Sequence, residues 1–425
     1  MKSNNHHIVF KKLDTTGIIF PSVSGRKNTN VFRITAVLKE KVTPEHLLKA
    51  LEKAADQMPS FKVKLKRGLF WYYFETNYHP LFIEEENDFP CRTMNKYKNN
   101  HYLFRLNYFG NRVNLEVFHV LCDGNGALEF LKNILYYYFI EKYPQEVTKN
   151  DIPPHNFYLS SETDEDGYPL FTSHIQNIKS ARDEKAFQFH LIRMPVPKLR
   201  IIEGDFSVAE VLKFSRSHQT SLTAFFASVL LLSIYHTQYK YHPKNKPIVI
   251  SIPVDMRNIC QSHTVRNFFI AINVGINFYQ KDYTFEEIIE EVTKQLKQKT
   301  QKDFLLNKAK SNVNIQQNKF LTFLPLPIKK IGLMIAYKIG EKGFTCTLSN
   351  MGKTTTAESF SHFIEGFGVT IGSSKSKSIK CSLCSYNDHL KLSFASTAYD
   401  REVEAYFFRF LSSLGISVTI TTNEV

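Results

Sequence analysis

With 425 residues, the chain is long enough for two domains, and its 43% hydrophobic and 22% charged residues are typical of a globular protein. The net charge of +14 favours anionic partners, but the basic residues are spread along the chain without a nucleic-acid-binding signature, so we expect no nucleic-acid partner. No secretory signal opens the chain and its most apolar run, 222–235, is about half a membrane span, so we predict a cytoplasmic location and no transmembrane segment.

The first 110 residues alternate between short strands and one helix. Strands are expected over 8–10, 31–37, 61–65 and 70–76, and a helix capped by Thr43 lies between the second and the third. A further strand runs up to a Gly-Asn turn, and we expect it to form a hairpin with the strand that follows.

The stretch between residues 112 and 139 organises the rest of the chain. Alternating apolar residues predict a strand that ends at His119. The turn formers CDGNG then break the strand, and apolar residues at helical spacing predict a helix beyond them. We therefore expect one imidazole to be held rigidly at the edge of a cavity, close to Asp123 and Gly124.

Six prolines between residues 143 and 200 break any long helix and predict a crossover between two domains. We place these domains at 1–180 and 181–425. Within the crossover, the acidic run SSETDEDG at 160–167 lacks the spacing of a calcium loop, and we interpret it as a solvated loop.

The second half begins again with helices and strands. Its helix TAFFASVLLLSIY is apolar nearly all round, which predicts burial. The segment IVISIP is an expected strand, and NFFIAINVGINF is either a strand pair or one long bent strand. A helix is expected over 285–299, and after an interval without predicted elements, strands recur from residue 345 and a last helix follows Asp400.

The cysteine spacing predicts no metal site. Six cysteines are scattered along the chain, and Cys381 and Cys384 form a single CxxC within an expected strand. Because a zinc site needs a second pair of ligands, we interpret these cysteines as structural and expect a reducing compartment.

His119, Asp123 and Gly124 spell His-x-x-x-Asp-Gly, which resembles the active-site motif of the chloramphenicol acetyltransferase-like superfamily. Within that group the chain looks most similar to bacterial alcohol acetyltransferase-like and condensation-domain-like proteins. Three later segments resemble family segments and come in family order, namely IPVDMRN, TVRNFF and TLSNMGK. The likeness covers most of the chain.

The resemblance implies an α/β fold of two similar domains. Each would be a mostly antiparallel, mixed sheet with flanking helices, and the active-site channel would lie at the domain interface. It also implies an acyltransferase that moves an acyl group from acyl-CoA to an alcohol or amine, with His119 as general base and no permanently bound cofactor. A neutral imidazole suits this task because the attacking group must lose a proton. An acyl carrier protein is the alternative source of the donor thioester.

Asp123 has two interpretations. It could orient His119, as in a hydrolase triad, or it could cap the helix and pair with an arginine. The resemblance and the position before the helix both favour the structural role. Arg257 is the preferred partner, with Arg26 or Arg33 as alternatives.

Five other residues near the motif are candidates for smaller roles. Gly124 is expected to permit a backbone angle or a close approach that a Cβ would prevent. Cys122 could be a nucleophile, although strand alternation points it to the opposite face. Thr347, Ser349 and Asn350 are candidates to bond the tetrahedral oxyanion, and equally they could be an ordinary polar strand end.

Two departures from the family pattern bear on specificity. Condensation domains usually carry a second histidine where this chain has Phe118. The late Asp-Phe-Gly-Trp-Gly motif of the plant enzymes is absent, and Trp71 is the only tryptophan. Two alternative functions are therefore kept. One is a non-catalytic relative used for binding or assembly, and the other is a condensation enzyme that depends on a carrier protein.

Overall fold

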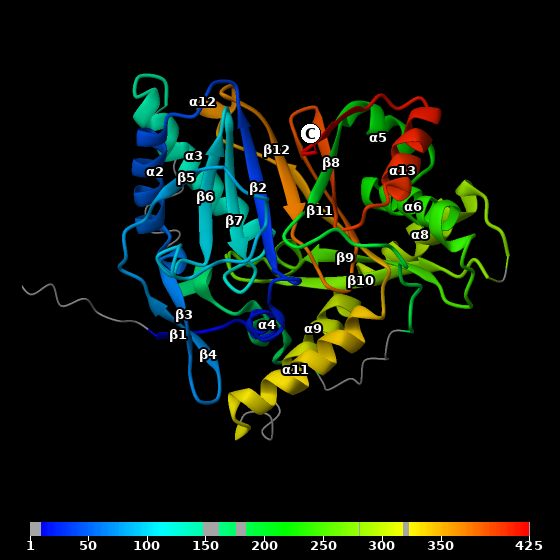
Figure 1. The fold of residues 1–425 in the computed structure, drawn as a ribbon, viewed down its shortest axis with the longest axis horizontal. Coiled ribbons are helices and arrows are strands. Elements are labelled where there is room, and N and C mark those ends of the chain that lie inside the picture. Colours follow the sequence, from blue (N-terminus) through cyan, green and yellow to red (C-terminus); the bar gives the residue numbers. More distant parts are fainter. Residues whose placement is uncertain (1–9, 148–160, 176–183, 280, 318–322, 425) are drawn as a thin grey trace, which may run out of the picture.

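The computed structural model describes residues 10–147, 161–175, 184–279, 281–317 and 323–424, and it shows two large β-sheets flanked by helices (Figure 1). Each sheet has its own hydrophobic core. The predicted α/β class, with mixed sheets and flanking helices, is confirmed.

The first large sheet has five strands in the order β12-β2-β7-β6-β5. Its β5–β6 pair is parallel, and the other pairs are antiparallel. The strands are β2 (Val31–Leu38), β5 (Ile83–Glu85), β6 (Phe104–Phe109), β7 (Arg112–Phe118) and β12 (Ile364–Ile371). Helices α2 (Pro44–Gln57) and α3 (Gly124–Lys142) pack together beside it (Figure 1).

The second large sheet has seven strands in the order β10-β9-β11-β13-β14-β8-β15. Its β11 pairs in parallel with both β9 and β13, and the remaining pairs are antiparallel. The strands are β8 (Arg200–Ser207), β9 (Ile248–Asp255), β10 (Phe269–Ile276), β11 (Cys346–Thr354), β13 (Ile379–Tyr386), β14 (His389–Ser396) and β15 (Thr419–Thr422). The expected strand pair or bent strand over 267–278 is thus the single strand β10.

Helices that accompany the seven-stranded sheet include α5 (Val208–Ser217), α6 (Leu222–Ile234), α8 (Phe285–Lys299) and α13 (Glu402–Ser413). As its uniformly apolar composition predicts, α6 is almost entirely buried. Among the described residues, no single helix has the length and hydropathy needed to cross a membrane. The α5–α6 pair reaches both only across an 82° bend.

Strand β12 comes from the predicted second domain but completes the first sheet. It pairs antiparallel with β2, so that Ile371 lies opposite Phe32. The predicted boundary at residue 180 lies outside the described residues and stays a prediction. What the structure adds is a strand that ties the two sheets together close to the end of β7.

The sequence did not predict that three of the short strands form a third, smaller sheet, nor did it predict two of the helices. The sheet has the order β1-β4-β3, from β1 (Phe10–Lys12), β3 (Val63–Arg67) and β4 (Tyr72–Thr76). The interval without predicted elements contains helices α9 (Lys302–Gln317) and α11 (Leu326–Glu341). Helix α11 lies at the lower margin of the molecule in Figure 1.

Some predicted boundaries were wrong. Phe61 belongs to a short 3-10 turn, and the strand begins only at Val63. Thr43 does precede α2, but its side chain makes no capping hydrogen bond. Its amide instead donates to the hydroxyl of Tyr138 at 3.0 Å, because α3 packs against the start of α2.

Candidate active site

The end of β7 and the start of α3 place the motif. Val113, Leu115 and Val117 are fully buried, which fixes the strand in the core. The amide of His119, the residue after β7, donates to the carbonyl of Asn30 at 2.8 Å, and this bond holds His119 beside the start of β2. The predicted strand, turn and helix therefore deliver the imidazole to the place where the two sheets meet.

The ring of His119 lies in a hydrogen-bonded chain that sequence reasoning missed. Its Nδ1 lies 2.8 Å from Oδ1 of Asn267. Asn267 Nδ2 donates to Oδ2 of Asp14 at 2.9 Å, and Asp14 Oδ1 accepts from the amide of Gly17 at 2.6 Å. Because the side-chain nitrogen of Asn267 donates to the Asp14 carboxyl group, the side-chain oxygen of Asn267 faces His119. In a neutral ring, Nδ1 therefore carries the proton and Nε2 keeps its lone pair.

The surroundings of the His119 ring favour its neutral form. Phe20 stacks on His119 with the ring centroids 4.5 Å apart, and Phe32 and Phe269 lie at 5.1 and 5.6 Å. Burial lowers the pKa of His119 below its ordinary value, although the charge of Asp123 opposes this shift. Burial also raises the pKa of Asp14 to about 7. A neutral imidazole is the form that can accept a proton.

Asp123 is fully engaged by its neighbours. Arg257 approaches it with two nitrogens, at 3.0 Å to Oδ2 and 2.9 Å to Oδ1. The amide of Gly126 donates to Oδ1 at 3.1 Å, so Asp123 caps α3, and the amide of Phe268 donates to Oδ2 at 2.8 Å. This bidentate, capped arrangement suits the structural role over that of a residue that orients His119.

Arg257 is fixed as firmly as the carboxylate it binds. It also pairs with Asp255 at 2.7 Å and donates to the carbonyls of Thr264 and Arg266 at 2.7 and 2.6 Å. The alternative partners lie elsewhere, because Arg33 binds Glu116 and Arg26 is exposed. The Asp123–Arg257 ion pair therefore joins the start of α3 to the segment that leads into β10.

Two glycines allow this close packing. A Cβ on Gly124 would lie 2.6 Å from Sδ of Met351, and a Cβ on Gly126 would lie 2.0 Å from the carbonyl oxygen of Val265. Met351 could move aside, but the backbone at Val265 could not. Gly126 is thus the more restricted position, and no signal in the motif distinguished it.

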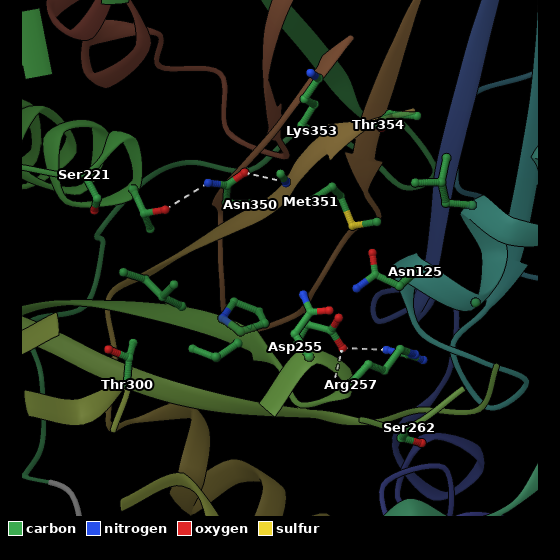
Figure 2. Close-up of a pocket in the computed structure, with 18 of the residues that line it drawn as sticks. Asn125, Ser221, Asp255, Arg257, Ser262, Thr300, Asn350, Met351, Lys353 and Thr354 are labelled. Carbon is green, nitrogen blue, oxygen red and sulfur yellow. Dashed lines mark hydrogen bonds and ion pairs between the residues drawn. The ribbon is translucent and has the colours of Figure 1, made fainter. Parts of the chain in front are cut away.

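His119, Asp123 and Gly124 line a cavity of about 170 Å³ between the sheets. Thr347, Ser349 and Asn350 of the polar β11 segment line it as well, whereas Arg257 lines a second, neighbouring cavity. A larger cavity of about 880 Å³ adjoins it (Figure 2). The two cavities share Asn125, Pro253, Asp255, Asn350 and Met351.

The three polar residues of β11 differ in how their side chains are used. Asn350 donates to Oγ1 of Thr223 at 2.8 Å and accepts from the amide of Gly352 at 2.7 Å (Figure 2). Its side chain therefore ties the middle of β11 to the start of α6. Ser349 and Thr347 are the better placed hydroxyls for a ligand in the small cavity.

Cys122, the candidate nucleophile, does not line the small cavity. Burial raises the pKa of the Cys122 thiol well above its ordinary value, so it stays protonated and is a poor nucleophile. Among the described residues, no group of His, Cys, Asp or Glu side chains is arranged to hold a metal ion.

The interpretation of the acidic run as a solvated loop was wrong for two of its carboxylates. Asp164 is a largely buried partner of Arg266 at 2.5 Å and of Lys11. Asp166 caps helix α4 (Gly167–Thr172) and accepts from Thr15 at 2.7 Å. Neighbouring cations and amides, which lie far away in the sequence, explain why these acids are not solvated.

No protein-family model matches the chain, and no curated protein matches it in sequence. Solved structures do match it along its whole length. TRI101 from Fusarium sporotrichioides, solved with coenzyme A and T-2, aligns with a TM-score of 0.66 at 12% identity, over 97% of this chain and 99% of that one.

Two further structures show how wide the likeness is. A trichothecene 15-O-acetyltransferase from Fusarium sporotrichioides aligns with a TM-score of 0.61 at 13% identity, over 96% of each chain. A starter condensation domain of rhizomide synthetase, solved with C8-CoA and Leu-SNAC, also has a TM-score of 0.61, at 10% identity, over 95% of this chain and 94% of that one. The chain therefore has the α/β fold that these acetyltransferase and condensation-domain structures share.

Proposed function

We propose that the protein is an acyltransferase that moves an acyl group from acyl-CoA to a hydroxyl or an amine, with His119 as general base. The observation that carries this proposal is the Nδ1 contact with Asn267. It leaves Nε2 of a neutral imidazole as the proton acceptor at a cavity between the two sheets. The fold neighbours that were solved with coenzyme A or C8-CoA support the choice of donor.

In the proposed reaction, the acceptor gives its proton to Nε2 of His119 while its oxygen or nitrogen attacks the thioester carbonyl carbon. The carbonyl oxygen becomes an oxyanion, to which the hydroxyl of Ser349 or Thr347 donates a hydrogen bond. Collapse of the tetrahedral intermediate breaks the carbon–sulfur bond. The proton then passes from His119 to the leaving thiolate, so no bond forms between enzyme and acyl group.

We assign the larger cavity to the coenzyme A part of the donor. Lys132, Lys297 and Lys353 line it and suit phosphate groups, although Lys132 also pairs with Glu129 at 2.6 Å. A thioester carbonyl would then lie where the two cavities join. The cytosol stays the predicted location, and the six cysteines, all of them buried free thiols, suit a reducing compartment.

The test combines binding and turnover. We expect acyl-CoAs to raise the melting temperature in a way that depends on the acyl chain, since a ligand at about 100 times its Kd adds roughly 2.7 kcal/mol. Thiol release with a panel of alcohols and amines should then depend on His119. Inorganic polyphosphate is the control for charge alone.

Two outcomes would replace this proposal. A shift matched by polyphosphate would exclude free coenzyme A and favour a carrier-protein thioester, as in condensation enzymes. Acyl-CoA binding without transfer to any acceptor, and unchanged by His119→Ala, would favour a non-catalytic relative.

A further inference from the structure

Helix α11 carries a row of isoleucines on the face that points away from the molecule. Leu326, Leu333 and Tyr337 lie on its inner face, and the Tyr337 hydroxyl hydrogen-bonds to the side chains of Asn28 and Ser374. The opposite face carries four isoleucines that are 54%, 62%, 54% and 48% exposed, namely Ile328, Ile331, Ile335 and Ile339. Their spacing of three and four residues places them on one stripe.

The apolar surface continues beyond the helix. The amide of Leu326 donates to the carbonyl of Leu69 at 2.9 Å, and Lys329 Nζ donates to the carbonyl of Phe70 at 3.0 Å. Leu69 is 69% exposed and Phe70 39%. We call this surface the α11 patch, and it consists of Leu69, Phe70, Phe323, Ile328, Ile331, Ile335 and Ile339. A group of exposed apolar side chains of this kind marks a site of interaction.

Cations lie near the α11 patch. Five exposed basic residues belong to its helix, to the residue after it and to the end of β3, namely Lys66, Arg67, Lys330, Lys338 and Lys342. The one acid of the helix, Glu341, lies on the inner face and accepts a hydrogen bond from Ser376. An apolar stripe with a cationic rim matches an anionic lipid surface, where the stripe enters the acyl boundary and the rim meets the headgroups.

We propose that the α11 patch docks the protein on the surface of an anionic membrane. The 16 residues of α11 span about 24 Å, so the helix would lie flat in the interface. A second copy is the weaker occupant, because a two-fold interface would bring two cationic rims against each other. The proposal does not depend on the acyltransferase chemistry.

The chain contains its own reporter for this test. Trp71 is the only tryptophan, and its ring centroid lies 3.3 Å from Lys329 Nζ, at the edge of the α11 patch. We would float the full-length protein with phosphatidylglycerol–phosphatidylcholine vesicles and with phosphatidylcholine vesicles. Trp71 fluorescence, and its quenching by brominated lipid, would be recorded in parallel.

We expect co-flotation with the anionic vesicles, a blue shift of Trp71 and quenching by brominated lipid. Ile331→Glu with Ile335→Glu should weaken partitioning at least about ten-fold, since two apolar contacts are lost and two repelled charges are gained. The matched control is Ile192→Glu with Ile420→Glu, at sites 78% and 50% exposed, and it should bind like the unaltered protein. Circular dichroism would verify that both variants fold.

Three results would overturn the proposal. The protein could stay with neither vesicle, or the α11 variant could float as well as its control. Light scattering without lipid could also show a dimer that the α11 variant dissociates, which would assign the α11 patch to a second copy.

Discussion

His119 and Asp123 belong to one motif, yet their side chains are held in opposite ways. In the part of the chain that the structure describes, the His119 ring makes one hydrogen bond, through Nδ1, and lines the cavity. Asp123 accepts from the amides of Gly126 and Phe268 and from both nitrogens of Arg257. A residue that reacts must keep one polar atom available, whereas a residue that holds the site must use them all.

The largest expected effect separates the two residues by activity. His119→Ala should lower kcat by about 10²–10⁴-fold, because the general base is lost while the fold stays intact. His362→Ala, at an exposed histidine outside the cavity, is the control. Steady-state kinetics and thermal unfolding would be measured together. A fully active His119→Ala protein would show that His119 is not the general base.

The next effect separates them by stability. Asp123→Ala should lower the free energy of unfolding by about 3–5 kcal/mol, because Arg257 loses a buried partner and α3 loses its cap. Arg257→Ala should cost a similar amount, and the double variant should cost less than the sum of the two. Denaturant unfolding measures all three. Additive losses would show that the ion pair is not the unit that holds the turn.

A smaller effect is expected from the residue that orients the base. Asn267→Ala should lower kcat about ten-fold with little change in KM, because Nδ1 loses the acceptor that fixes the ring and its tautomer. Asn277→Ala, at a half-buried asparagine just after β10 that bonds to Asn245, is the control. A change in KM alone would mean that Asn267 acts on substrate binding.

The smallest effect is a pH dependence. Because burial lowers the pKa of His119, its neutral form should predominate at pH 7, and kcat/KM should fall as the pH drops through a value below 6.5. A pH–rate profile with acyl-CoA checks this. A midpoint above 6.5 would mean that the charge of Asp123 outweighs burial.

The His-x-x-x-Asp-Gly motif and the Asp123–Arg257 ion pair could be predicted because their signals are local or are repeated along the chain. Alternation in β7 and helical spacing in α3 placed His119, and the IPVDMRN segment drew attention to Arg257. The Asn267–Asp14 chain could not be predicted in this way. Asn267 lies 148 residues from His119 and 253 from Asp14, and short polar residues at such separations have no periodicity to reveal them.

Helix α11 was missed for a different reason. Helix prediction relies on an apolar face and a polar face, but α11 has apolar residues on its inner and its outer face, with lysines between them. Its neighbour α9 also lacks a strong pattern. By contrast, α6 is apolar all round, and this composition predicted a buried helix. The structure agrees, because the core of the second large sheet surrounds α6.

Strand β12 has a consequence for how the chain is made. On the ribosome β2 is synthesised long before β12, so one edge of the first sheet must wait with open N–H and C=O groups. Such an edge is a template for wrong pairing until about the last seventh of the chain is made. The amino-terminal half is therefore a poor unit for separate expression, and premature termination before residue 364 should yield aggregates rather than a smaller folded protein.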